Sequence, residues 1–253
     1  TSGTRRVSLV TRTLLVRLAD LPLTAVLSAH RVPMPSAPAS YRIKYSTLSI
    51  GLEDFHLCSL RDKQQFADLD GLAEKAGISS ATWSLFGQLW PAGEVLAQTL
   101  SGMAVDGLRI LELGCGLGLT SLVLQRLGAD ITASDYHPLA GEFLLRNAAL
   151  NQLQPVPYQS CDWAEDYQQL GLFDLVIGSD LLYERDHPSL LAGFIDRHCN
   201  RHAAVLIVDP GRGNSARFSR HMLEHGYLQL ADSLNLLDNP DAPFKGRILS
   251  YRR

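Results

Sequence analysis

The stretch Leu111-Glu112-Leu113-Gly114-Cys115-Gly116-Leu117-Gly118 decides the fold of this chain. It completes a short apolar run that begins at Leu108 and has the length of a buried parallel strand. Beyond the glycines, apolar residues recur at helical spacing as far as Gly128, which predicts a helix that ends there. Three glycines at alternate positions permit a sharp turn and let a ligand approach the backbone closely. The stretch therefore predicts a strand, a glycine-rich turn and a helix, with a ligand at the carboxyl end of the strand.

The glycine spacing and the next strand indicate what kind of ligand this is. The pattern G-x-G-x-G differs from the dinucleotide fingerprint, which needs its third glycine at position 119, where this chain has leucine. A second strand is predicted over residues 131–135, and it ends in Asp135, whose carboxylate can accept hydrogen bonds from both hydroxyls of a ribose. A glycine-rich turn alone is also compatible with a tight connection that binds nothing. The acid at Asp135 favours a ligand that contains a nucleoside.

At these residues the chain resembles the class I methyltransferases, which use S-adenosyl-L-methionine. The stretch from Glu112 to Gly118, with Cys115 inside it, looks like their first motif, and Asp135 looks like their ribose-binding acid. The resemblance implies that S-adenosyl-L-methionine is the cofactor. It also implies a seven-strand sheet whose last strand is reversed.

The order of elements along the chain favours the same architecture. Strands that alternate with helices indicate a mostly parallel sheet covered on both faces, and two final strands without a helix between them must pair antiparallel. We therefore expect an α/β fold with a Rossmann-like, doubly wound seven-strand sheet, preceded by two N-terminal β strands between residues 41 and 60. The further predicted strands cover residues 156–161, 173–179, 203–208, 227–237 and 247–251, and the further predicted helices cover 91–102, 138–151, 187–198 and 215–225.

The length of 253 residues indicates one domain with an appendage. We expect a methyltransferase domain over residues 41–253, in which 41–80 form a strand and helix appendage and 81–253 the Rossmann-like core. Residues 1–40 are expected to be an extension and linker. Their first 38 residues carry five arginines against one aspartate, which permits a targeting peptide but favours an unstructured extension.

Composition limits the partners and the compartment. The net charge of −3 gives no general attraction to nucleic acid, and no window approaches the ~20 apolar residues that a membrane helix needs. Four scattered cysteines are typical of a reducing compartment, so we expect a cytoplasmic protein, with the mitochondrial matrix as the alternative. His198 and His202 lie four residues apart near the end of a predicted helix, where imidazoles suit the helix dipole, and we expect no metal site.

Two further segments follow predicted strands and carry polar side chains. Asp162 and Trp163 come directly after the third strand, where an acid can accept from an adenine amino group and an indole can pack on the purine. A helix cap followed by a core tryptophan is the alternative. After the fourth strand, Asp180 can hold an amine by hydrogen bonds and Tyr183 can stabilise its cationic character. The alternative is that Asp180 caps the helix that begins near Asp186.

The resemblance becomes narrower at these residues. D-x-x-Y after the fourth strand looks like the signature of the seven-strand protein-lysine methyltransferases called family sixteen, which also carry a W-P-x-x-x-x-L-A element ahead of the first motif. This implies N-methylation of a lysine side chain in a protein, with Asp180 and Tyr183 as catalytic residues. The resemblance implies that the cofactor is bound by Trp90, Glu112, Gly114, Cys115, Gly116, Gly118, Asp135, Asp162, Trp163 and Ser179.

Alternatives to protein-lysine methylation remain at this stage. The turn Asp209-Pro210-Gly211-Arg212 looks more like bacterial relatives of unassigned substrate, so a small-molecule N-methyltransferase is possible. A second alternative is a cofactor-binding scaffold without turnover. A nucleic-acid methyltransferase is disfavoured, because Asp180 is followed by two leucines instead of the Pro-Pro-aromatic motif of that class.

Overall fold

The computed structural model describes residues 41–62, 71–230 and 244–253 of the chain. The extension and linker expected over residues 1–40 lie outside the described residues. The same holds for residues 63–70 of the expected strand and helix appendage, and for the end of the strand expected over 227–237.

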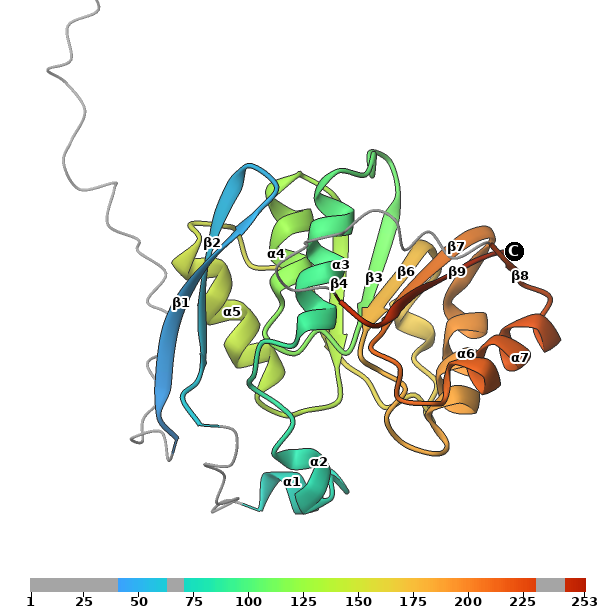
Figure 1. Cartoon of the computed structure of the whole chain (residues 1–253), viewed down its shortest axis with the longest axis horizontal. Coiled ribbons are helices and arrows are strands. Elements are labelled where there is room, and N and C mark those ends of the chain that lie inside the picture. The colour runs from blue at the N-terminus through green and yellow to red at the C-terminus, as the bar shows by residue number, and fades with distance from the viewer. Residues whose placement is uncertain (1–40, 63–70, 231–243) are drawn as a thin grey trace, which may run out of the picture. The chain divides into compact units, whose positions relative to one another are not determined.

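The core is a seven-stranded sheet in the order β5-β4-β3-β6-β7-β9-β8 (Figure 1). Its strands are β3 (Arg109–Leu113), β4 (Asp130–Asp135), β5 (Tyr158–Ser160), β6 (Phe173–Ser179), β7 (Cys199–Asp209), β8 (Leu228–Gln229) and β9 (Arg247–Arg252). Strands β3 to β7 are parallel, and β9 runs antiparallel to both β7 and β8. The predicted seven-strand sheet with a reversed last strand is confirmed.

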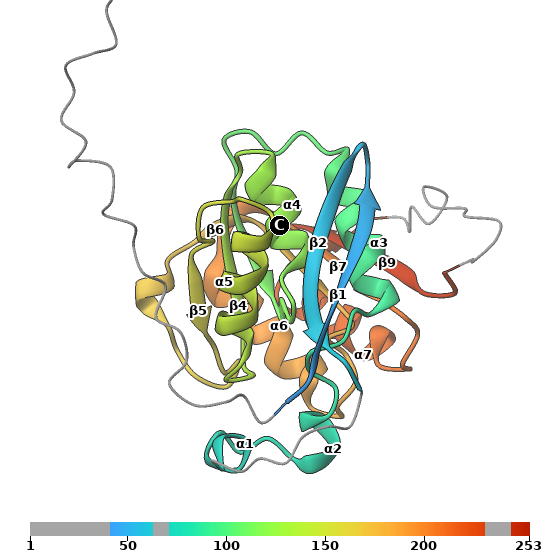
Figure 2. The same cartoon turned by 90° about the vertical axis from the view of Figure 1, so that its left-hand side faces the viewer.

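Helices cover both faces of this sheet, as expected for a doubly wound fold. The long helices are α3 (Pro91–Ser101), α4 (Leu119–Arg126), α5 (Ala140–Leu150), α6 (His187–His198) and α7 (Ser215–Glu224). Side chains of α3, α4 and α5 pack with Ile110 and Ile131 on one face, whereas those of α6 and α7 pack with Leu111 and Leu113 on the other (Figures 1 and 2). Successive residues of a strand point to opposite faces, so both helical layers follow from the apolar residues of β3.

The two N-terminal strands form a hairpin on the layer of α3, α4 and α5. Strands β1 (Ile43–Ile50) and β2 (Glu53–Leu60) pair antiparallel around a turn at Gly51. Asn147 of α5 and Asn151, the C-cap of that helix, each exchange two hydrogen bonds with the β2 backbone, at 2.7–3.2 Å from the main-chain atoms of Cys58 and His56. Their side-chain amides therefore satisfy the edge of β2 that β1 does not cover.

Several boundaries differ from those predicted. Strand β5 begins at Tyr158 instead of residue 156, because the preceding Pro157 has no N–H and only its carbonyl pairs, with Ala133. Helix α5 starts two residues later than predicted. Strand β7 is longer than predicted and follows α6 directly, so His202 lies in a strand and not at a helix end.

Two short helices, α1 (Leu72–Lys75) and α2 (Ser80–Trp83), and a single 3-10 turn, η1 (Gln168–Leu170), complete the described elements. No helix among the described residues is both long and apolar enough to cross a membrane.

Candidate active site

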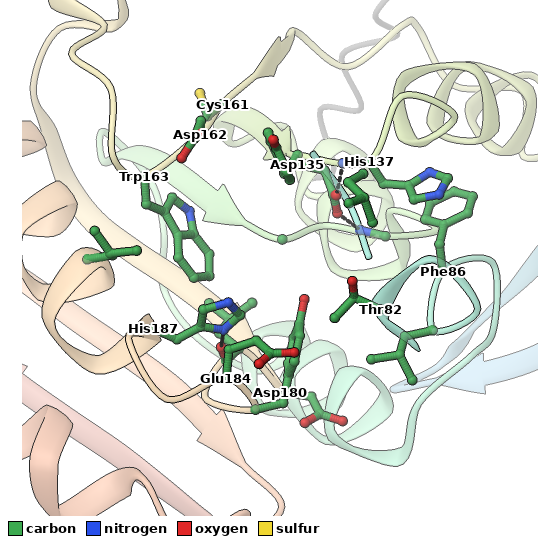
Figure 3. A pocket seen from close by; sticks show the side chains of 18 of the residues that line it. Thr82, Phe86, Asp135, His137, Cys161, Asp162, Trp163, Asp180, Glu184 and His187 are labelled. Atoms are coloured by element: carbon green, nitrogen blue, oxygen red, sulfur yellow. Dashed lines mark hydrogen bonds between the residues drawn. The ribbon is translucent and has the colours of Figure 1, made fainter. Parts of the chain in front are cut away.

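A pocket of about 510 Å³ opens at the carboxyl ends of β3, β4, β5 and β6 (Figure 3). This is the edge at which an open parallel sheet places its ligand. The predicted site residues that line it are Trp90, Gly114, Gly116, Asp135, Asp162, Trp163, Ser179, Asp180 and Tyr183. The other three predicted site residues, Glu112, Cys115 and Gly118, do not line it.

The glycine turn forms the floor of the pocket in left-handed backbone. Gly116 has φ +55, and a Cβ there would meet no protein atom within 4 Å, so its missing side chain leaves space in the pocket. Gly118 has φ +81, and a Cβ there would collide with the buried side chain of Leu144. The absence of a side chain at Gly116 therefore leaves room for a ligand, whereas its absence at Gly118 allows the turn to pack on α5.

Asp135 joins the glycine turn to the end of β4. Its Oδ2 accepts the N–H of Gly116 and its Oδ1 accepts the N–H of His137, both at 2.8 Å. Burial raises the pKa of this carboxyl, and the two backbone N–H groups act against that rise. A carboxylate has about four lone-pair sites, so Asp135 can still accept from ribose hydroxyls.

Glu112 lies beneath the turn, outside the pocket. The Ser121 hydroxyl of α4 donates to its carboxylate. Burial raises the pKa of Glu112 to about 7, against the opposing hydrogen bonds from Ser121 and Thr120. Cys115 is also buried, and its N–H donates to the Ser134 carbonyl at 2.9 Å. Both residues hold the turn in place and do not face the ligand space.

Asp162 and Trp163 follow β5 on one side of the pocket, across from Asp135 and His137 (Figure 3). Asp162 Oδ1 accepts the N–H of Ala164 at 2.9 Å, which shapes a local turn and leaves its other oxygen for a ligand. The Trp163 ring contacts the His187 ring edge-on at 5.3 Å between centroids.

Asp180 forms an ion pair with Arg212 that the sequence did not predict. Its backbone is left-handed, with φ +55, and its N–H donates to the Val208 carbonyl at 2.8 Å. The Arg212 guanidinium binds both carboxylate oxygens, with Nε 2.5 Å from Oδ1 and Nη2 2.7 Å from Oδ2. The residue that precedes α6 at its N-terminal cap is Asp186, so Asp180 does not cap that helix.

Tyr183 and His187 form an aromatic pair beside Asp180. Their ring centroids are 4.6 Å apart in an edge-to-face arrangement. Burial raises the pKa of the Tyr183 phenol to about 12, so the hydroxyl is protonated at neutral pH. His187 Nδ1 lies 2.7 Å from the Leu181 carbonyl oxygen, and because a carbonyl can only accept, Nδ1 donates.

Several pocket residues were not predicted as site residues, and three groups of them bear on the chemistry. Arg212 belongs to the Asp209–Arg212 turn, whose sequence had signalled a departure from the family pattern. His187 was assigned only to the start of a helix. The third group comes from the segment before α3, in which Gly77, Ile78, Ser79, Thr82, Leu85 and Phe86 line the pocket.

The residues present fit S-adenosyl-L-methionine. The open space over Gly116, the carboxylate of Asp135 and the indole of Trp163 match a methionine chain that passes close to the backbone, a ribose and a purine respectively. In the part of the chain that the structure describes, no three His, Cys, Asp or Glu side chains gather in a way that could hold a metal ion.

Comparison with known protein families agrees with this geometry. The model of a family described as lysine methyltransferase matches residues 78–225. The electron transfer flavoprotein beta subunit lysine methyltransferase of Mus musculus is 33% identical over 158 residues, which is 61% of this chain and 59% of that protein. Protein N-lysine methyltransferase METTL21A of Xenopus tropicalis is 30% identical over 149 residues, 56% of this chain and 65% of that protein. The chain thus spans about three fifths of the curated relatives that it matches.

Solved structures share the fold at lower identity. The 16S rRNA N2 G1207 methyltransferase of T. thermophilus, in complex with AdoMet and guanosine, has a TM-score of 0.55 at 16% identity, over 87% of this chain and 52% of that one. The ribosomal protein L11 methylase of Lactobacillus delbrueckii has a TM-score of 0.51 at 18% identity, over 64% of this chain and 78% of that one. These likenesses concern the Rossmann-like fold.

Proposed function

This chain belongs to the lysine methyltransferase family, and we propose that it methylates a lysine side chain of a protein with S-adenosyl-L-methionine as the methyl donor. One observation carries the proposal: Asp180 and Tyr183 line the same pocket as the glycine turn and Asp135. A carboxylate and an aromatic ring suited to an amine therefore share one space with the groups suited to the cofactor.

The cofactor, when bound, supplies an activated methyl group on a sulfonium. We assign the ribose to Asp135, the adenine to Asp162 and Trp163, and the methionine part of the cofactor to the turn at Gly114 and Gly116. Trp90 and Ser179 lie at the Asp180 side of the pocket lining. Each of these residues binds or orients the cofactor.

We place the substrate lysine side chain at the part of the pocket that Asp180 and Tyr183 line. Methyl transfer is an in-line displacement, so the protein has mainly to position a neutral amine. We assign the amine to Asp180, which accepts its hydrogen bonds, and to Tyr183, whose ring stabilises positive charge as it develops. Glu184 and Asp186, which also line the pocket, add negative charge suited to a basic segment of protein.

The test is transfer of a radiolabelled methyl group. Purified chain, labelled S-adenosyl-L-methionine and cell lysate are incubated together, with purified electron transfer flavoprotein beta subunit in a parallel reaction because one group of relatives is named for it. We expect label in protein, at lysine. Label confined to small molecules would favour a small-molecule N-methyltransferase, and cofactor binding without any label would favour the scaffold.

We also propose a reducing compartment for this protein, either the cytoplasm or the mitochondrial matrix. All four cysteines are buried and unpaired, which supports it. Fractionation of cells that express the tagged full-length protein tests the compartment, and secretion of that protein would contradict it.

A further inference from the structure

The proposed function requires a proton to leave the substrate before the methyl group arrives. A lysine side chain has an ordinary pKa of about 10.4 and is an ammonium ion at neutral pH. An ammonium nitrogen has no lone pair and cannot attack carbon. The pocket therefore needs a group that accepts this proton, and this inference rests on the proposed function.

The two predicted catalytic residues are poorly suited to accept the proton. Each oxygen of Asp180 already accepts a charge-assisted hydrogen bond from Arg212, and a proton taken up by the carboxylate would displace one of them. Tyr183 keeps its own proton at neutral pH, because burial raises the pKa of its phenol to about 12. They can orient the amine, but neither is a good acceptor for its proton.

Two imidazoles line the pocket, and their hydrogen bonds indicate opposite tautomers. His137 Nδ1 accepts the N–H of Leu139 at 3.2 Å, so its neutral ring carries the proton on Nε2. Its ring also stacks on Phe86 at 3.9 Å between centroids. His187 is the reverse case. Its Nδ1 donates to the Leu181 carbonyl at 2.7 Å, so its neutral ring presents a lone pair on Nε2.

The position of His187 suits proton transfer at the lysine site. It is the first residue of α6, it contacts the ring of Tyr183, and it borders the pocket together with Glu184 (Figure 3). Imidazole is also the side chain whose ordinary pKa, about 6.5, lies nearest to neutral pH, which favours it as a general base.

We propose that His187 is the general base of the reaction. Nε2 of His187 takes one proton from the lysine ammonium, and the electron pair left on Nζ forms the new N–C bond. The C–S bond breaks with its electron pair on the sulfur, which becomes a neutral thioether. The proton then leaves the imidazolium to solvent through the open mouth of the pocket.

Titratable and charged side chains from four segments line the pocket around this step. The segment between β6 and α6 contributes Asp180, Tyr183, Glu184 and Asp186, the end of β4 and the residues after it contribute Asp135, Tyr136 and His137, the segment after β5 contributes Asp162, and the loop after β7 contributes Arg212. The carboxylates outnumber the guanidinium, which suits a cationic lysine side chain.

The first experiment compares pH profiles of the methylation rate, with whole lysate protein and labelled S-adenosyl-L-methionine as the probes. The variant His187→Gln keeps an amide N–H for the Leu181 carbonyl but cannot act as a base near neutral pH. We expect a rate roughly 10²-fold or more below wild type at pH 7. We also expect the variant's rate to rise about tenfold per pH unit to about pH 9, where the wild-type rate has levelled, because the lysine itself must then ionise.

Matched controls separate this role from a structural one. His221→Gln makes the same change on α7, outside the pocket, and should leave both rate and profile unchanged. Melting temperature and calorimetric affinity for S-adenosylhomocysteine should be the same in His187→Gln and wild type. If His187→Gln loses rate but keeps the wild-type pH profile, His187 is a positioning residue and the proposal is overturned. A rate of His187→Gln within threefold of wild type would also overturn it.

A second experiment needs no substrate. Nitrogen-15 spectra of the wild-type imidazoles at neutral pH report which ring nitrogen carries the proton. We expect Nδ1–H for His187 and Nε2–H for His137. A proton on Nε2 of His187 would overturn the proposal even if transfer is observed. Failure of the wild type to label any protein would instead reject the proposed function, and the general base with it.

Discussion

Arg212 forms an ion pair with Asp180 from a loop 32 residues further along the chain, and its guanidinium binds the two carboxylate oxygens at 2.5 and 2.7 Å. The carboxylate side chain is only 10% exposed and the arginine side chain 37%. Asp180 also has left-handed backbone, which is uncommon for a non-glycine residue although aspartate tolerates it better than most. The ion pair therefore fixes the direction in which the Asp180 carboxylate lies in the pocket.

The first prediction concerns this pair. Arg212→Ala should lower kcat about tenfold, equivalent to about 1.4 kcal/mol, because Asp180 loses the fork that orients it. The kcat of Arg212→Lys should lie between those of wild type and Arg212→Ala, since an ammonium makes one contact where the guanidinium makes two. Steady-state kinetics on the labelled protein measures this, with Arg201→Ala at the opposite end of β7 as the control. A variant with a lower KM and a higher kcat would instead mean that Arg212 competes with the substrate.

The second prediction concerns the cofactor. Asp135→Ala should weaken the binding of S-adenosylhomocysteine by roughly 1.5–3 kcal/mol, the range for hydrogen bonds to a charged group. Titration calorimetry measures it. Asp130→Ala, at the exposed start of the same strand, should bind as wild type does. Wild-type affinity in a folded Asp135→Ala protein would contradict the assignment of the ribose to Asp135.

Two glycines of the turn should separate binding from stability. Gly116→Ala should reduce cofactor affinity, because its Cβ enters the pocket, and cost about 1–2 kcal/mol of stability for the left-handed backbone. Gly118→Ala should lose more stability, since its Cβ also collides with Leu144. Thermal unfolding and calorimetry on both variants measure the two effects. Equal loss of stability in both would contradict the assignment of Gly118 to packing.

The buried carboxyl of Glu112 should make stability depend on pH. Its pKa is about 7 in the folded protein against an ordinary 4.5, so the folded state favours the protonated form. The stabilisation is complete below about pH 4.5 and is lost as the pH rises through about 7. Glu112→Gln stays neutral, so its stability relative to wild type should grow over this window by roughly 3 kcal/mol. Denaturant unfolding at several pH values measures the difference, and a constant difference would contradict the burial of a titrating Glu112.

Much of the fold could be predicted because apolar patterns are local. The strand at Phe173–Ser179 and the helix at His187–His198 were predicted with the bounds that they have, since an apolar run and helical spacing each lie within one segment. The bounds of β8 could not be predicted in this way, because a strand was expected over residues 227–237 and the described strand covers only Leu228–Gln229. It has two exposed residues, and its place depends on pairing with β9.

The site could be predicted less fully, because contacts between distant segments have no local pattern. Asp180 was predicted, but its partner Arg212 depends on the left-handed backbone at Asp180 and on the path of the loop after β7. The tautomer of His187 likewise depends on the Leu181 carbonyl, which a sequence does not place. The spacing of the glycines could predict the turn. It could not predict that Gly118 packs against Leu144 whereas Gly116 borders the pocket.

The central claim is that Asp180 presents a protein lysine to the methyl donor. The most direct measurement is peptide mass spectrometry of the labelled protein after reaction with wild type and with Asp180→Asn, using Asp106→Asn, at an exposed position outside the pocket, as the matched control. We expect a methyl group on a lysine with wild type and with Asp106→Asn, and its near absence with Asp180→Asn while S-adenosylhomocysteine still binds. A methyl group on another residue type, or undiminished lysine methylation by Asp180→Asn, would contradict this account.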